Sequence, residues 1–458
     1  MTIKPTRRTF LQSTGAAGFG LATVGFPSGA FAQESGAEPV RVLSIGVIGT
    51  IGGLDRSEVN SHPRAKIVGL CDVDSAALAK AAEDHPEAFT CADYREAFRD
   101  HADEFDAVIV ATPDHSHAPI ALMAMAHDKH VYGQKPLVHQ LEEISLIERA
   151  VAAKPHLVTQ VGNQRMVYPG RRAAVEILRS GVLGPAIEAY AWTGSPNPGS
   201  YFNFDGVVSA PMTPPDDLDW DLWLGPCEAR PYRDLLVPVK WRSWWDFGTG
   251  GLGDWAVHVL DVIFFGFDEL QSPVAVKTHA PKPADTFHTY PCSSTITYAV
   301  ESEAFARPFF SIHYSDRRQT PSRAALGLPG DDWPDSNMTV IVCEGGILAL
   351  EAGGGIEVWR NGEATDGLAE PGLPEFGELN HWHAWIDNIV GLDTELRTPF
   401  TDGARITEAG LLAVKASRFP GQELHWDKDT LSFTNHPEAT DTIVRRDYRT
   451  GFAPPEVV

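Results

Sequence analysis

Two polar residues four positions apart, Asp254 and His258, have the spacing and the chemistry of a proton-transfer pair. Residues four apart in a helix share one face, and a histidine that titrates near neutral pH can act as a general base or acid. An isolated pair of this kind is more often a helix cap or a buried core histidine. The glycine-rich run 250–253 directly before it, together with Lys135 in a Gly-Gln-Lys-Pro segment, favours the functional interpretation.

A glycine-rich turn near the start of the chain is the candidate dinucleotide site. The run Val40–Ile48 predicts a buried parallel strand, and a strand, a glycine turn and a helix together bring helix N–H groups to a pyrophosphate. If Gly49 is the first glycine, the later positions of Gly-x-Gly-x-x-Gly are not glycines, so a looser turn fits better. The residues expected to contact the dinucleotide here are Gly49, Thr50, Ile51, Gly52 and Gly53.

Asp72 ends the second apolar run, Ala65–Cys71, and is the candidate ribose ligand. A carboxylate about twenty residues after the glycine turn accepts hydrogen bonds from the adenosine ribose hydroxyls and repels a 2′-phosphate. No Arg or Lys follows it closely, so NAD is favoured over NADP. The alternative, an aspartate that only starts a turn or a helix, stays open on this residue alone.

Strand and helix patterns alternate through the first part of the chain and change character after about Pro169. Further strands are predicted at 65–71, 106–111, 130–132 and 157–161, with helices at 76–83, 119–127 and 141–153. This alternation predicts an α/β fold that begins with a doubly wound parallel Rossmann sheet. The later runs predict a C-terminal α/β domain with an open, mainly antiparallel sheet, closed by helices at 381–389 and 406–417.

Composition excludes several classes of partner. The chain has 458 residues, enough for two domains, and a formal charge of -24, which repels nucleic acid and anionic lipid. Its five cysteines are scattered, a pattern compatible with at most a sparse disulfide set. The histidine pairs His115/His117 and His381/His383 lack obvious converging ligands, so no metal site is predicted.

The first 32 residues have the three regions of a twin-arginine export signal. Arg7-Arg8 is followed by a Gly/Ala-rich apolar stretch and by Ala30-Phe31-Ala32, a small-x-small cleavage site. We therefore expect a signal peptide at 1–32, a linker at 33–40, an NAD-binding domain at 41–168 and a substrate and oligomerisation domain at 169–458. The expected location is the periplasm or the exterior, reached in the folded state.

Several segments in order along the chain resemble the Gfo/Idh/MocA oxidoreductases, the family of glucose-fructose oxidoreductase and inositol dehydrogenase. They include Gly133-Gln134-Lys135-Pro136, the segment 250–261 with its Gly-Gly-x-x-Asp-x-x-x-His pattern, the segment 111–117 (Ala-Thr-Pro-Asp-His-Ser-His), and the segment 162–165 (Gly-Asn-Gln-Arg). The likeness is especially close to secreted, sugar-associated members that carry the pattern Leu-Asp-Trp-Asp-Leu-Trp-Leu-Gly-Pro, found here at residues 218–226.

The resemblance implies roles for particular residues. His258 would exchange a proton with the reacting hydroxyl, Asp254 would lie beside it, and Lys135 would donate a hydrogen bond to the developing alkoxide. Further cofactor contacts implied by position are Thr112, Pro113, His117, Gln134, Lys135 and Gln164. Substrate contacts are expected from Arg165, Tyr168, Trp241, Asp254 and His258, although packing at the domain junction is an equally good role for Trp241.

Two departures from the family pattern bear on the cofactor. Gln134 replaces the usual acid before the lysine, which removes a negative charge near Lys135, and the glycine turn with its helix at 54–61 looks shortened. The expected activity is hydride transfer between NAD and a sugar, polyol or glycoside hydroxyl by a homodimer or homotetramer, with a tightly held cofactor recycled in place. The alternatives are an NAD-dependent redox-neutral glycoside hydrolase or lyase, and a non-catalytic sugar-sensing protein.

Overall fold

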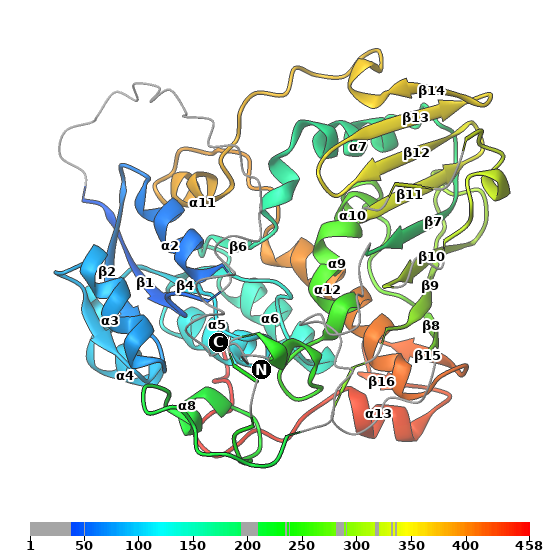
Figure 1. Ribbon diagram of the computed structural model, residues 1–458. Helices are drawn as coiled ribbons and strands as arrows, with labels where there is room; N and C mark the ends of the chain where they lie inside the picture. Colours follow the sequence, from blue (N-terminus) through cyan, green and yellow to red (C-terminus); the bar gives the residue numbers. More distant parts are fainter. Residues whose placement is uncertain are drawn as a thin grey trace, which may run out of the picture. The chain divides into compact units, whose positions relative to one another are not determined.

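A six-stranded parallel sheet forms the framework of the first domain (Figure 1). In sheet order, its strands in the computed structural model are β3 (Phe89–Cys91), β2 (Ala65–Cys71), β1 (Val40–Ile45), β4 (Ala107–Val110), β5 (His130–Gly133) and β6 (Thr159–Val161). Its helices are α2 (Gly52–Asn60), α3 (Ser75–Asp84), α4 (Tyr94–Asp100), α5 (His117–Ala126) and α6 (Leu141–Ala153), with 3-10 turns η1 (Ala102–Glu104), η2 (Asp114–Ser116) and η3 (Gln164–Val167).

The residues described are 38–49, 51–193, 209–233, 236–237, 239–280, 288–289, 291–316, 320–330, 333–334 and 337–458. The predicted signal peptide, residues 33–37 of the predicted linker, and Thr50 lie outside them. Among the described residues, no helix is both long and apolar enough to cross a membrane.

The strand order explains where a ligand site can form. β1 pairs on one side with β2 and on the other with β4, both in parallel. All four residues of β4 are fully buried, as expected for a strand covered on both faces by helices. Since the chain order reverses between β1 and β4, the loops that follow these two strands diverge and leave a crevice at their carboxyl ends.

The glycine turn differs from its predicted form. β1 ends at Ile45, not at Ile48, so Gly46 is the first residue of the turn. Gly46 has φ +84°, and a Cβ there would lie 2.5 Å from the Ala111 carbonyl oxygen. A Cβ on Gly52 would lie 2.1 Å from the Gly46 carbonyl oxygen. The turn therefore depends on Gly46 and Gly52 for close packing, with Gly49 between them, and α2 begins at Gly52 rather than Leu54.

A ten-stranded sheet forms the framework of the second domain, as predicted, and it is antiparallel except where β10 pairs with β7. In sheet order its strands are β14 (Glu363–Asp366), β13 (Ile356–Arg360), β12 (Gly346–Glu351), β11 (Met338–Cys343), β7 (Ala186–Trp192), β10 (Phe309–Ser315), β9 (Ser293–Ala299), β8 (Ala275–His279), β15 (Glu423–Asp427) and β16 (Ser432–Phe433). Burial alternates along β9, so one face of the sheet is covered.

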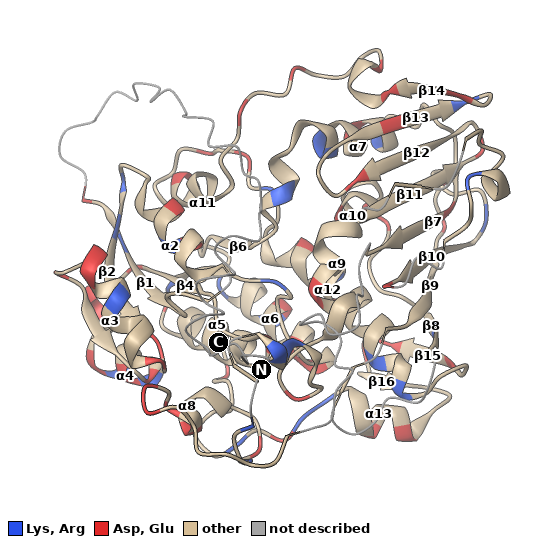
Figure 2. Cartoon of the chain, in the orientation of Figure 1, with Lys and Arg blue, Asp and Glu red and all other residues tan. Residues whose placement is uncertain are grey.

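The remaining helices are α7 (Pro169–Arg179), α8 (Trp220–Leu224), α9 (Gly250–Val259), α10 (Asp261–Gly266), α11 (His381–Ile389), α12 (Phe400–Lys415) and α13 (Pro437–Ile443). The remaining 3-10 turns are η4 (Lys240–Ser243), η5 (Ala324–Leu326), η6 (Gly367–Ala369) and η7 (Ala416–Arg418). Acidic positions are spread over the helices and strands of both domains (Figure 2).

Helices from late in the sequence return to the first sheet, so residues 39–458 form one compact unit. α11 was predicted as a closing helix, and it packs beside α2 (Figure 1). Its Trp385 and Ile386 are buried in the same apolar cluster as Val42 and Ile109 of the first sheet. Trp385 Nε1 also donates to the Val158 carbonyl, 3.2 Å away. The Rossmann layer is thus completed by a helix from the carboxyl-terminal third of the chain.

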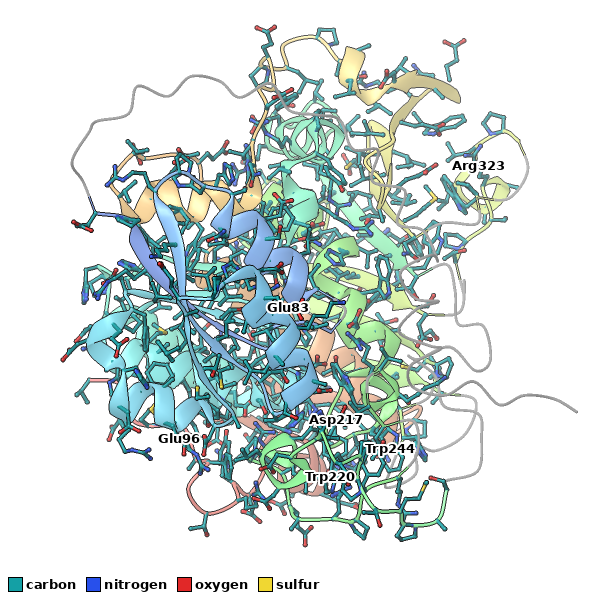
Figure 3. The ribbon with its side chains drawn as sticks, turned by 60° about the vertical axis from the view of Figure 1, so that its left-hand side comes forward. Glu83, Glu96, Asp217, Trp220, Trp244 and Arg323 are labelled. Atoms are coloured by element: carbon teal, nitrogen blue, oxygen red, sulfur yellow. The ribbon has the colours of Figure 1, made fainter. Side chains whose placement is uncertain are left out.

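A Trp-rich segment, made up of the described residues of 209–249, follows β7 in the chain. Its apolar side chains form a cluster of their own that includes Trp223, Trp244 and Phe247; Asp217, Trp220 and Trp244 are labelled in Figure 3. All five cysteines of the chain are free thiols.

We predict that Gly46→Ala destabilises the fold more than Gly49→Ala does. Both residues have positive φ, which costs an alanine about 1–2 kcal/mol. An alanine at position 46 would also overlap the backbone of Ala111, whereas a Cβ on Gly49 meets no heavy atom within 4 Å. Urea unfolding of the cofactor-free protein should show at least about 2 kcal/mol between the two variants. Equal losses of stability would contradict the close packing of Gly46.

Candidate active site

Lys135 and Asp254 form a direct ion pair between the two domains. Lys135 follows β5, and the Lys135–Pro136 peptide bond is cis. Its Nζ lies 2.7 Å from Asp254 Oδ2 and 3.2 Å from the Asp254 carbonyl oxygen on α9. The two side chains are only 18% and 7% exposed. The lysine and the Asp-x-x-x-His helix predicted from sequence are therefore brought together.

A second cation and a second carboxyl group surround this pair. Arg242 Nε lies 3.5 Å from Asp254 Oδ1, so the Asp254 carboxylate is held between two cations. Asp114, just after β4, is buried and accepts a hydrogen bond from Thr249 at 3.0 Å. Burial, and then the charge of Asp254, raise the pKa of Asp114 to about 7. Near neutral pH the site therefore contains, beside the Lys135–Asp254 ion pair, a carboxyl group that titrates.

A chain of buried polar groups sets the tautomer of His258. Asn163 Nδ2 donates to Asp261 Oδ2 at 3.0 Å, which turns Asn163 Oδ1 toward His258 Nδ1, 3.2 Å away. Because that oxygen can only accept, Nδ1 must carry the proton, and Nε2 keeps a free lone pair. Asp261 is in turn paired with Arg171, which also donates to the His258 carbonyl oxygen at 2.8 Å.

His258 is held in its neutral form. Burial lowers the pKa of His258 well below its usual value, and the positive charge of Lys135 is the next largest cause. Nε2 has no hydrogen-bond partner among the described residues. A neutral imidazole with a free Nε2 near an ammonium group is suited to accept a proton from a hydroxyl group.

Trp255 lies next to His258, and Arg165 lies over Trp255. The rings of Trp255 and His258 meet edge to face with centroids 5.5 Å apart. The Arg165 guanidinium lies over the Trp255 ring at 5.2 Å, and its Nη1 donates to the Ala352 carbonyl oxygen. Trp255 is only partly buried, so part of its aromatic side chain is accessible. Arg165 was predicted from sequence, whereas Trp255 was not.

The crevice at the end of β1 fits a dinucleotide. A Cβ on Gly49 would meet no heavy atom within 4 Å, so there is open space above the turn. The Ile51 N-cap of α2 supplies no side-chain cap, which leaves helix N–H groups for an anion. Thr112 Oγ1 and Gln164 Oε1, two predicted cofactor contacts, are buried without a hydrogen-bond partner among the described residues. Such orphaned atoms are suited to hydrogen-bond a polar ligand.

Asp72 lies at the end of β2 beside the glycine turn. Its Oδ2 accepts from the Val47 N–H at 3.0 Å and its Oδ1 accepts from the Asp74 N–H at 3.0 Å. Burial raises the pKa of Asp72 to about 6, so the group is mainly ionised at neutral pH. The carboxylate thus ties down the glycine turn and presents negative charge where a ribose is expected.

Other predicted residues have mainly packing contacts. The two ring nitrogens of His117 face the carbonyl oxygens of Thr112 and Pro136, at 2.8 and 2.6 Å, so His117 joins the loop of Pro113 to the lysine loop. Tyr168 packs at the turn of Gly354. Trp241 is 6% exposed in the Trp-rich cluster, the packing role that was weighed for it.

Sequence reasoning missed six polar or glycine residues of this site. Asn163 and Asp261 lie inside segments that resemble family motifs. Their role in setting the tautomer of His258 became visible only in the structure. The missed residues are Gly46, Asp55, Asp114, Asn163, Arg242 and Asp261. Among the described residues, no three His, Cys, Asp or Glu side chains are grouped to hold a metal ion.

The parallel sheet with its open glycine turn, and the neutral histidine beside an ammonium group, define an NAD-binding oxidoreductase. Two sequence models of one family match the chain: "Oxidoreductase family, NAD-binding Rossmann fold" over residues 40–162, and "Oxidoreductase family, C-terminal alpha/beta domain" over 175–302. The chain therefore belongs to the Gfo/Idh/MocA oxidoreductase family.

Curated relatives are similar over part of their length. An inositol 2-dehydrogenase/D-chiro-inositol 3-dehydrogenase of Lacticaseibacillus casei is 30% identical over 185 residues, which are 39% of this chain and 53% of that protein. A glycosyl hydrolase family 109 protein of Saccharopolyspora erythraea is 29% identical over 179 residues, 33% of this chain and 38% of the relative. The chain thus spans about half, or less, of the curated relatives it matches.

Solved structures share the fold. The WlbA dehydrogenase of Bordetella pertussis, in complex with NADH and UDP-GlcNAcA, is 16% identical with a TM-score of 0.56, and 85% of this chain and 99% of that chain are covered. An aldose-aldose oxidoreductase of Caulobacter crescentus, complexed with glycerol, is 13% identical with a TM-score of 0.56, covering 85% and 100%.

We predict that His258 stays neutral at pH 6 and carries its proton on Nδ1. ¹⁵N NMR of histidine-labelled protein should show this tautomer, with the His258 signals assigned by their loss in a His258→Gln variant. Asn163→Leu removes the acceptor of the Nδ1 proton, so it should shift the population toward the other tautomer. An imidazolium signal for His258 at pH 6 would contradict the geometry.

Proposed function

We propose that this oxidoreductase transfers hydride between NAD and a hydroxyl-bearing carbon of a sugar, polyol or glycoside. The observation that carries the proposal is the neutral His258 with a free Nε2, held near the Lys135 ammonium at the carboxyl edge of the Rossmann sheet. The similarity to an inositol dehydrogenase supports the substrate class. The negative charge of the Asp72 carboxylate would repel a 2′-phosphate, which favours NAD over NADP.

The protein groups have distinct tasks in the proposed reaction. When bound, the nicotinamide ring supplies the hydride acceptor or donor. His258 Nε2 accepts the proton of the substrate hydroxyl, and the Lys135 ammonium donates a hydrogen bond to the oxygen as negative charge develops on it. Asp254 holds the ammonium in place, and the Trp255 face carries the sugar ring.

A redox-neutral glycoside cleavage is the second candidate, favoured by the similarity to glycosyl hydrolase family 109 proteins. In that reaction a sugar carbon is oxidised, the glycosidic substituent is eliminated, and the ring is reduced again. The same His258 and Lys135 would serve the oxidation step. Release of the aglycone from a glycoside without accumulation of NADH would select this candidate over net oxidation.

We predict that Lys135→Ala and His258→Asn each slow reduction of the bound nicotinamide by about 100-fold or more, the usual contribution of a positioned proton-transfer group. The measurement is the absorbance of the reduced cofactor after addition of a panel of aldoses, polyols and glycosides. Lys66→Ala, an exposed lysine paired with Glu87, is the control and should keep full activity. Activity equal to that of the parent protein in both active-site variants would refute the assignment.

The tight hold on the cofactor is part of the proposal, and the Trp-rich segment supports it. Leu218 makes an antiparallel bridge with Asp74, and the Ser75 N–H donates to the Asp217 carbonyl oxygen at 2.8 Å. These contacts lie directly after Asp72, where the adenosine ribose is expected, so the segment borders the adenosine end of the site. A cofactor held there needs the segment to move before it can leave.

The carboxyl-terminal tail fastens this segment from outside. Arg449 donates to the Asp221 carboxylate at 2.5 Å, to the Asp221 carbonyl oxygen at 2.6 Å and to the Gly225 carbonyl oxygen at 2.9 Å. Arg446 pairs with the buried Glu143 of α6 at 2.6 Å. The tail therefore connects the Trp-rich segment to the body of the first domain.

We predict that Arg449→Ala speeds dissociation of NAD about tenfold, since charged hydrogen bonds contribute about 1.5–3 kcal/mol and 1.4 kcal/mol is one decade in rate. Arg445→Ala is the matched control, because Arg445 is half exposed and faces Glu142 instead. Stopped-flow displacement of bound NAD measures both rates. Identical rates in the two variants would refute the fastening role of the tail.

Export through the twin-arginine route and assembly into a homodimer or homotetramer complete the proposal. The Arg7-Arg8 signal with its cleavage site after Ala32 supports export, and a compartment without free nicotinamide favours a retained cofactor. Native mass spectrometry of protein recovered from the periplasm tests these points together. It should show a chain that begins after Ala32, bound NAD and more than one subunit; a cytoplasmic, uncleaved monomer without NAD would contradict all three.

A further inference from the structure

Gln134, which stands where the family motif has a glutamate, has a fixed orientation. It is 3% exposed and lies against Gly162, where a Cβ would come within 2.5 Å of its Nε2. Its Nε2 donates to Asp55 Oδ2 at 2.7 Å, and its Oε1 accepts from the backbone N–H of Lys135 at 3.3 Å. The amide therefore connects a carboxylate on α2 to the backbone of the active-site lysine.

Asp55 is fully buried on the first turn of α2. Its second oxygen, Oδ1, accepts from Trp382 Nε1 of α11 at 2.9 Å. Both oxygens thus face N–H donors from different elements, an arrangement that suits an ionised carboxylate and not a protonated one. A buried charge of this kind lowers the stability of the fold unless every hydrogen-bond partner is in place.

We propose that Asp55 is a positioning residue for Lys135, supplying through the Gln134 amide the buried carboxylate that relatives carry at position 134. This inference rests on the proposed role of Lys135 in hydride transfer. An isolated amide could be turned either way round. The carboxylate of Asp55 forces the NH₂ group of Gln134 toward itself, which leaves Oε1 to accept from Lys135. The helix that faces the dinucleotide is thereby linked to the lysine.

The charge state of Asp55 decides whether this link holds. Burial raises the pKa of Asp55 to about 7, and the groups that face it are Glu58 on α2, Tyr132 on β5, Gln134 and Trp382. A folded-state pKa above the unfolded value means that the ionised form costs stability. This cost begins to fall as the pH drops below about 7 and is gone only below the usual aspartate pKa of about 4. Protonation of Asp55 removes this cost. It also places an O–H group opposite N–H donors, so the hydrogen bond that orients Gln134 is lost.

The test compares how fast the Lys135 amine reacts in variants that remove the carboxylate at position 55, add one at position 134, or do both. Acetic anhydride is the probe, and mass spectrometry of the Lys135 peptide gives the labelling rate at pH 8 and pH 6. Asp55→Asn should raise the rate at pH 8 about threefold or more, and the difference from the parent protein should vanish at pH 6. Gln134→Glu alone should lower the melting temperature, because two carboxylates then meet.

The double variant Asp55→Asn/Gln134→Glu moves the carboxylate to position 134 and restores a donor opposite it. Its labelling rate at pH 8 should lie within twofold of the parent rate. Its melting temperature should lie within a few degrees of the parent value. Glu58→Gln, which removes a charge one turn along the same helix, is the control and should leave the labelling of Lys135 unchanged.

Labelling of Lys135 in Asp55→Asn that matches the parent protein at both pH values would overturn the inference, as would a double variant with the summed defects of the two single ones. The labelling needs no substrate. A protein without hydride transfer that still shows the predicted pattern would therefore contradict the proposed function and support the positioning role.

Discussion

The ion pair between Lys135 and Asp254 is the constraint on which the rest of the site depends. Each partner comes from a different domain, and each is largely removed from water. Breaking such a pair leaves an uncompensated charge in a poorly solvated place, which is far more costly than losing an exposed pair. The pair therefore fixes helix α9, and with it His258, against the carboxyl end of β5, in the sheet whose strand order opens a crevice between β1 and β4.

The same constraint explains the charge states in the site. Burial opposes a positive charge on His258, and the nearby Lys135 ammonium group acts in the same direction, so the imidazole stays neutral. The opposing carboxylate of Asp254 is already occupied by Lys135 and Arg242. Asp261, a further acid near His258, is neutralised by Arg171. Asp254 and Asp261 thus each have a counter-charge, while His258 Nε2 keeps a free lone pair.

The sequence predicted the architecture well because its strong signals are local. Buried β-branched runs with helices between them specify a parallel sheet, and the Asp254/His258 spacing specifies one face of a helix. The start of the glycine turn was misplaced because Ile45-Gly46-Val47-Ile48 continues the apolar pattern of the strand, and the required positive φ of Gly46 has no signature in hydropathy. Contacts between distant segments, such as Asp55 with Trp382, are fixed by tertiary packing that spacing does not encode.

The two departures from the family motif meet at one hydrogen bond. The glycine turn was expected to be shortened, and that expectation was wrong: it runs from Gly46 to Gly52, one residue longer than Gly-x-Gly-x-x-Gly. It leads directly into the turn of α2 that carries Asp55. Gln134, the replacement for the motif glutamate, is the partner of that aspartate at 2.7 Å. Considered separately, a longer turn and a lost acid both weaken the case for a working cofactor site. Considered together, they keep one buried carboxylate next to the lysine loop and transfer its origin from β5 to the dinucleotide helix.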